Sequence, residues 1–186
     1  MTTTGANLRR VTEWVVGLSS VLFLCIYSSD AQRHSETVSR AYVGSNGAVR
    51  VVRADGREVV IPKEKEQQGA EELQISDNHK TLGWLVEYPN CCTSYPIPMT
   101  VVLYRDGRII HRLQNGRAIF RWTFMKGGEQ VAYFSDSVHS NLAPECVLVD
   151  VGTGRTVEDW RRDKGPLPAW AKIFADDVGS VTSETR

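Results

Sequence analysis

Two adjacent cysteines, Cys91 and Cys92, lie in the proline-rich stretch PNCCTSYPIP at residues 89–98, and a third, Cys146, follows the polar stretch DSVHSNLAPE at residues 136–145. A catalytic redox pair usually has the C-x-x-C spacing beside the start of a helix. A zinc site needs four ligands at characteristic spacings. Neither pattern is present, so a stabilising disulfide is the favoured interpretation. Free thiols, a metal site and a redox site stay open as alternatives.

The stretch SDSVHS at residues 135–140 contains Asp136, Ser137 and His139, the residue types of a hydrolase triad. Triad members meet in space and are rarely neighbours in the sequence. The G-x-S-x-G turn that presents a nucleophilic serine is absent downstream of residue 31. A polar loop between strands accounts for the same residues. We therefore expect a binding loop and no catalytic residue, with a small secreted hydrolase as the alternative.

The charge balance argues against nucleic acid as a partner. The chain has 186 residues, with 22 Lys plus Arg and 22 Asp plus Glu, so its formal net charge is zero. A neutral chain has no long-range field to attract a polyanion. The glycine-containing stretch at residues 44–47 reads as a hairpin turn without a following helix, so it does not predict a phosphate site. We expect no metal and no cofactor.

The N-terminus has the layout of a secretory signal peptide. Arg9 and Arg10 precede an apolar stretch at residues 14–27, and Ser29 and Ala31 have the small-residue spacing that signal peptidase recognises. Cleavage after Ala31 would export the protein to the periplasm or the medium without stable membrane insertion. The alternative is a retained anchor through residues 14–27, although this stretch is shorter than the roughly 20 residues that span a bilayer.

The rest of the chain predicts an all-β domain at residues 41–162. It follows a disordered linker at 32–40 and precedes a tail at 163–186 with one short helix at 166–177, whose Trp170, Ile173 and Phe174 share a side. Period-two runs of Val, Ile and aromatic residues predict strands. The predicted strands are 41–44, 48–54, 57–61, 73–76, 82–88, 100–105, 108–113, 118–124, 129–135, 146–151 and 155–160.

These strands repeat with a period near 50 residues. VVRADGREVV at 51–60 matches VLYRDGRIIH at 102–111 and, more loosely, LVDVGTGRTV at 148–157. ISDNHKTLGWLVEY at 75–88 aligns with FMKGGEQVAYFSDS at 124–137. Such a period with four strands per unit is typical of propeller blades. We expect antiparallel blades: two complete four-stranded units and a shorter first one.

The stretches ISDNHKTLGWL and TFMKGGEQVAYF resemble the TolB-type, WD-like β-propeller repeat over about residues 41–160. The chain departs from that repeat at Asp77-Asn78, where Pro-Asp is usual, and at residues 126–128, which lack the Asp. The resemblance implies an incomplete propeller and no catalytic residues; a β-sandwich is the alternative. Together, the signal peptide, the repeat and the lack of a catalytic constellation favour an exported, non-enzymatic binding or scaffold protein with an unknown protein or ligand partner. Self-association through an open blade edge is a further possibility.

The repeat also suggests how the cysteines pair. It places residues 89–98 and 136–145 as equivalent loops, each joining the second and third strands of its unit. Adjacent units can bring such loops together. We therefore expect a disulfide from Cys92, or from Cys91, to Cys146.

Overall fold

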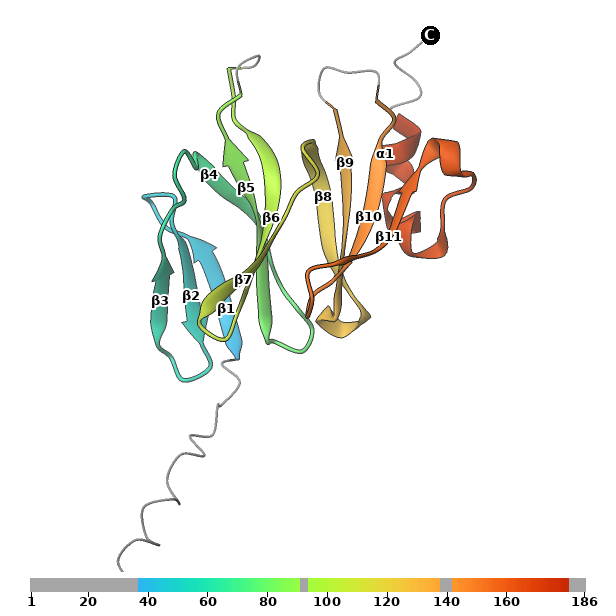
Figure 1. Ribbon diagram of the computed structural model, residues 1–186. Coiled ribbons are helices and arrows are strands. Elements are labelled where there is room, and N and C mark those ends of the chain that lie inside the picture. Colours follow the sequence, from blue (N-terminus) through green and yellow to red (C-terminus); the bar gives the residue numbers. More distant parts are fainter. Residues whose placement is uncertain (1–36, 91–93, 138–141, 181–186) are drawn as a thin grey trace, which may run out of the picture. The chain divides into compact units, whose positions relative to one another are not determined.

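Eleven strands form three antiparallel sheets in the part of the chain that this computed structural model describes, residues 37–90, 94–137 and 142–180 (Figure 1). The first sheet has the order β1-β2-β3, the second β4-β5-β6-β7 and the third β11-β10-β9-β8. Each sheet is therefore a meander of consecutive strands. The predicted fold class, two complete four-stranded units and a shorter first one, is confirmed, and no sheet closes into a barrel.

The strand bounds follow the predicted ones closely. The strands are β1 (Val38–Val43), β2 (Val49–Arg53), β3 (Glu58–Ile61), β4 (Gly69–Ile75), β5 (Thr81–Tyr88), β6 (Ile97–Arg105), β7 (Arg108–Leu113), β8 (Ala118–Met125), β9 (Gln130–Asp136), β10 (Glu145–Asp150) and β11 (Thr156–Arg161). Short 3₁₀ helices follow β8 (η1, Lys126–Gly128) and β11 (η2, Arg162–Lys164).

Three strands, β1, β4 and β6, begin three or more residues earlier than the sequence predicts. β1 includes residues 38–40 of the expected linker, because Val38 is buried and its backbone N–H donates to the carbonyl of His79 at 2.8 Å. β4 begins at Gly69, inside a charged stretch that reads as a connector. The two charged residues of β4, Glu71 and Glu72, are exposed and lie at an irregularity of the strand, so they do not prevent its pairing with β5.

The predicted short helix of the C-terminal tail is present and has two parts. A 3₁₀ helix, η3 (Ala169–Phe174), runs into α1 (Ala175–Ser180). Trp170 and Phe174 pack against the third sheet as expected, but Ile173 is 41% exposed. The prediction for Ile173 was wrong because the tail begins as a three-residue-per-turn helix, which turns each side chain away from its α-helical position. No helix within the described ranges is long and apolar enough to cross a bilayer.

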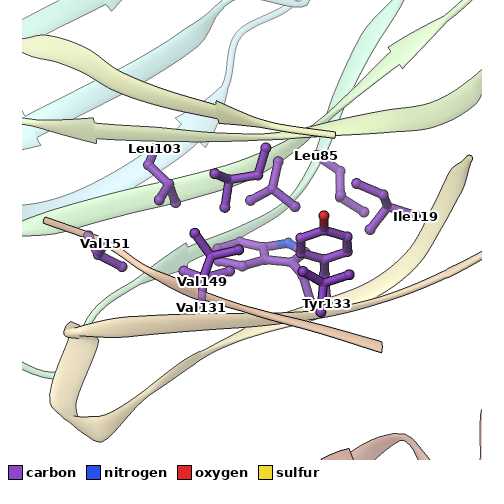
Figure 2. Packing of buried hydrophobic residues seen from close by; sticks show 11 residues of the cluster. Leu85, Leu103, Ile119, Val131, Tyr133, Val149 and Val151 are labelled. Carbon is purple, nitrogen blue, oxygen red and sulfur yellow. The ribbon is translucent and has the colours of Figure 1, made fainter. Parts of the chain in front are cut away.

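Three apolar layers hold the sheets together. The first layer lies between the first and second sheets, the second between the second and third sheets (Figure 2), and the third between the third sheet and the C-terminal tail. In β6, Val101 and Leu103 belong to the second layer while Val102 and Tyr104 belong to the first. Successive side chains thus enter opposite layers. This explains why the central strands read as nearly continuous apolar runs, which are typical of sheets buried on both faces.

The two outer faces of this stack differ in polarity. Tyr42, Arg50 and Glu58 lie on the solvent side of the first sheet, where the Tyr42 hydroxyl donates to Glu58 at 2.9 Å and Arg50 pairs with Glu58 at 2.5 Å. This polar network keeps the pKa of Glu58 below its usual value. The third sheet instead presents an apolar outer face, which the helices η3 and α1 cover.

Trp122 of β8 joins the second and third sheets. Its indole Nε1–H donates to the carbonyl of Glu72 at 3.2 Å, and Gln74 donates its side-chain N–H to the Trp122 carbonyl at 2.8 Å. Glu72 lies in an irregularity of β4, with a positive φ of 49°. The indole also lies over Gly83, where a Cβ atom would come within 2.4 Å of the ring. Gly83 thus provides the space in which the ring fits.

We expect Gly83→Ala to lower the free energy of unfolding by about 1–3 kcal/mol, because the new methyl group must displace the buried Trp122 ring. Urea denaturation followed by tryptophan fluorescence measures this change. Gly179→Ala is the matched control, since a Cβ there meets no atom within 4 Å. Its effect should stay within about 0.5 kcal/mol. Equal effects of the two substitutions would contradict the role of Gly83.

Candidate functional site

The predicted binding loop joins β9 to β10. Asp136 is the last residue of β9, and its carboxylate Oδ1 accepts a hydrogen bond from the backbone N–H of Ser137 at 2.7 Å. Both residues are half-buried. The third residue predicted there, His139, lies outside the described residues. The Asp136 carboxylate thus forms a local hydrogen bond with the backbone of the next residue, as aspartate often does where a strand ends.

A polar cluster at the base of this loop was not predicted. Asn115, in the connection from β7 to β8, donates from Nδ2 to Ser135 Oγ at 2.7 Å and to Glu145 Oε2 at 2.9 Å. Arg117 Nε lies 4.0 Å from the same carboxylate, and the side chains of Arg117 and Glu145 are only 13% and 17% exposed. We call Asn115, Arg117, Ser135 and Glu145 the loop base. Its hydrogen bonds link β9 and β10, which carry the loop, to the connection between β7 and β8.

The loop base also shapes its electrostatic surroundings. Burial raises the pKa of the Tyr133 hydroxyl to about 12, and the nearby Glu145 carboxylate adds to this effect. Tyr133 therefore stays neutral and keeps its place in the second apolar layer. Residues 114–117 lie between two predicted strands, and no pattern in the sequence indicated that Asn115 would bond to Ser135 and Glu145.

A second loop leaves the stack at the same end (Figure 1). It joins β5, which ends at Tyr88, to β6, which begins at Ile97. Thr100 of β6 donates to Gln114 at 3.3 Å, and Gln114 precedes Asn115 of the loop base. The sequence repeat correctly predicted that these two loops are equivalent connections in neighbouring sheets. The candidate site is therefore the end of the stack where both loops emerge.

Each of these loops presents a large apolar side chain to solvent. Tyr95 of the β5–β6 loop is 62% exposed and Leu142 of the β9–β10 loop is 58% exposed. Within the described ranges, no other large apolar side chain is more exposed than these two. We call Tyr95 and Leu142, with Asp136, Ser137 and the loop base, the loop surface. Sequence reasoning missed both residues, because exposure of a loop side chain has no periodic signal.

Cys146 directly follows Glu145 of the loop base, but its side chain packs toward the C-terminal tail. It is a fully buried free thiol in the third apolar layer, where Phe134 and Trp160 are its partners on the neighbouring strands. Burial raises the pKa of this thiol to about 12, with smaller contributions from the carboxylates of Asp177 and Glu145. The next residue, Val147, faces the second sheet instead.

Cys91 and Cys92 lie outside the described residues, so the disulfide to Cys146 stays a prediction. The position of Cys146 restricts how this disulfide could form. The thiol faces the C-terminal tail, whereas the loop that carries Cys91 and Cys92 connects strands of the second sheet. A disulfide would therefore require the Cys146 side chain to leave the third apolar layer.

Within the described ranges, no group of three histidine, cysteine, aspartate or glutamate side chains is placed to hold a metal ion. The chain matches no protein-family model, and no curated protein matches it. The site therefore has to be interpreted from its own residues.

We expect the Cys146 thiol to resist alkylation by iodoacetamide in the native protein, because the thiolate is the reactive form and burial suppresses it. Mass spectrometry of the Cys146 peptide measures the labelling. Rapid labelling of the native protein would contradict the buried position. Two further labelling experiments show whether Cys146 forms a disulfide. Labelling in denaturant alone shows a free thiol, whereas labelling that also requires a reductant shows a disulfide.

Proposed function

We propose that this chain is an exported, non-enzymatic binding or scaffold protein that holds a protein partner on its loop surface. The observation that carries the proposal is the exposure of Tyr95 and Leu142 on two loops at one end of the stack. Large apolar side chains that stay in water while others are buried are typical of interaction sites. Tyrosine in particular is enriched among the residues that dominate binding energy.

The rigidity of the loop base supports this proposal. The side chain of Asn115 bonds to both Ser135 and Glu145, which lie on the two strands that carry the β9–β10 loop. A surface whose supports are already fixed loses less conformational entropy on binding. Covering one large apolar side chain is worth about 1.5–3 kcal/mol. Two such residues would thus contribute substantially to a specific contact.

Export and the relation to propellers belong to the same proposal. Residues 1–31 would be the signal peptide, and a disulfide involving Cys91 or Cys92 would suit an oxidising compartment. The three stacked meanders are compatible with blades of the TolB-type repeat. Proteins built from repeated units commonly bind partners along one side of the array, which suits a surface made of equivalent loops.

Site-specific photo-crosslinking tests the proposed surface. A photoreactive residue at position 95 or 142 in cells that export the protein should give a discrete crosslinked product, because both positions would lie in the interface. Position 157 on β11 is the matched control, since Val157 is 53% exposed but belongs to the outer strand of the third sheet. Leu142→Ala should reduce the product formed from position 95 by roughly tenfold, as expected for an interface residue worth more than about 1 kcal/mol.

Equal crosslinking from positions 95, 142 and 157, or none from 95 and 142, would contradict the proposal. A product of twice the chain's mass would identify the partner as a second copy, the self-association expected from an open sheet edge. The hydrolase alternative is tested separately. A hydrolytic activity lost in His139→Ala, with the fold unchanged, would establish it.

A further inference from the structure

An open groove lies at the hairpin between β6 and β7, next to the turn between β10 and β11. Its volume is about 470 Å³. The lining consists of Arg105, Asp106, Arg108, Ile109, Ile110 and His111 on one side, with Val151 and Gly152 on the other. Sites for small molecules commonly have volumes of this order. No part of this groove belongs to the loop surface.

Two arginines of the groove stand directly opposite each other. Arg105 at the end of β6 pairs in register with Arg108 at the start of β7, so the two side chains project from the same face of the sheet. Leu103 and His111 form the next pair on that face, which faces the third sheet. Like charges directly across a hairpin destabilise it unless a counter-charge lies between them.

The protein provides little counter-charge at this position. Arg105 donates from Nε to the hydroxyl of Thr81 at 2.8 Å, a neutral acceptor. Within the described ranges, neither Arg105 nor Arg108 forms an ion pair. The carboxylate of Asp106 lines the groove, so the lining has two arginines against one aspartate.

The other nearby carboxylate, Asp150, already has partners. Its Oδ1 accepts hydrogen bonds from the backbone N–H and from the hydroxyl of Thr153, both at 2.7 Å. These bonds keep the pKa of Asp150 below its usual value, and the nearby His111 contributes to the same effect. Asp150 thus remains charged and bound to its own turn.

The equivalent hairpin of the first sheet shows a different arrangement. By the sequence repeat, Ala54 stands where the second sheet has Arg105, and Arg57 corresponds to Arg108. Arg57 Nε lies 3.3 Å from the carboxylate of Asp55 in its own turn. The first hairpin also has two arginines, Arg53 and Arg57, but Arg57 has a carboxylate partner in its own turn, whereas in the described part of the chain neither arginine of the second hairpin has one. The groove, together with the lack of an ion pair at Arg105 and Arg108, distinguishes the second hairpin.

We propose that this groove binds a small organic anion, with its carboxylate or phosphate group held between Arg105 and Arg108 and its apolar part against Ile110. The planar guanidinium group matches the oxygen geometry of both kinds of oxyanion. An anion between the two side chains would also remove their mutual repulsion. The half-buried Ile110 offers a hydrocarbon surface that inorganic phosphate cannot use.

Titration followed by NMR or calorimetry tests the proposal on the full exported chain, with phenyl phosphate and benzoate as probes. At least one of them should bind saturably, more tightly than inorganic phosphate and than neutral benzyl alcohol. Comparing the two anions shows whether the site prefers phosphate or carboxylate. Arg108→Gln should weaken the preferred probe by roughly tenfold, the loss expected when a charged hydrogen-bond partner is removed.

Matched variants make the test specific. Arg57→Gln removes the equivalent arginine of the first hairpin and should leave binding unchanged. Asp106→Asn removes the only carboxylate of the lining and should strengthen binding. Because Arg108 is exposed, its substitution should not affect folding, which the unfolding midpoint checks. Absence of saturable binding by both anions, or equal losses in Arg108→Gln and Arg57→Gln, would overturn the proposal.

Discussion

The contact of Trp122 with the second sheet is the interaction on which the rest of the structure depends. None of the three sheets has an apolar core of its own, because each is buried only by what lies against its faces. The second apolar layer joins the larger two sheets, and Trp122 of that layer forms two hydrogen bonds to β4, one with its indole N–H and one with its carbonyl. A bulge at Glu72 and the missing side chain of Gly83 are both needed to seat it.

A stack of open sheets has two outer faces, and the chain makes one of them polar and covers the other. At the first sheet, Arg50, Glu58 and Tyr42 make the outer face polar, so water can cover it. At the third sheet, the outer face keeps Phe134 and Trp160, so the tail must cover it. Arg121 holds this tail by an ion pair with Asp177 at 2.6 Å. The β5–β6 and β9–β10 loops therefore rest on a stack whose two outer faces are both protected.

Much of this fold could be predicted from the sequence, because period-two apolar runs and Asp-Gly turns define strands and hairpins locally. The repeat at 51–60 and 102–111 even indicated the correct number of strands in each unit. What sequence reasoning missed depends on contacts between units. The side of β10 on which Cys146 lies follows from the order in which sheets and tail stack. The loop base likewise needs Asn115, in the connection from β7 to β8, to meet Ser135 of β9, which no local pattern indicates.

Native-state hydrogen exchange tests most directly whether Trp122 makes the second and third sheets one cooperative unit. The slowest amide protons of β5 and β6 should open with the same free energy as those of β9 and β10, because neither sheet can lose its neighbour and stay folded. Trp122→Phe should lower both values by the same amount. A lower opening free energy for the third sheet alone, or an effect of Trp122→Phe confined to that sheet, would contradict this account.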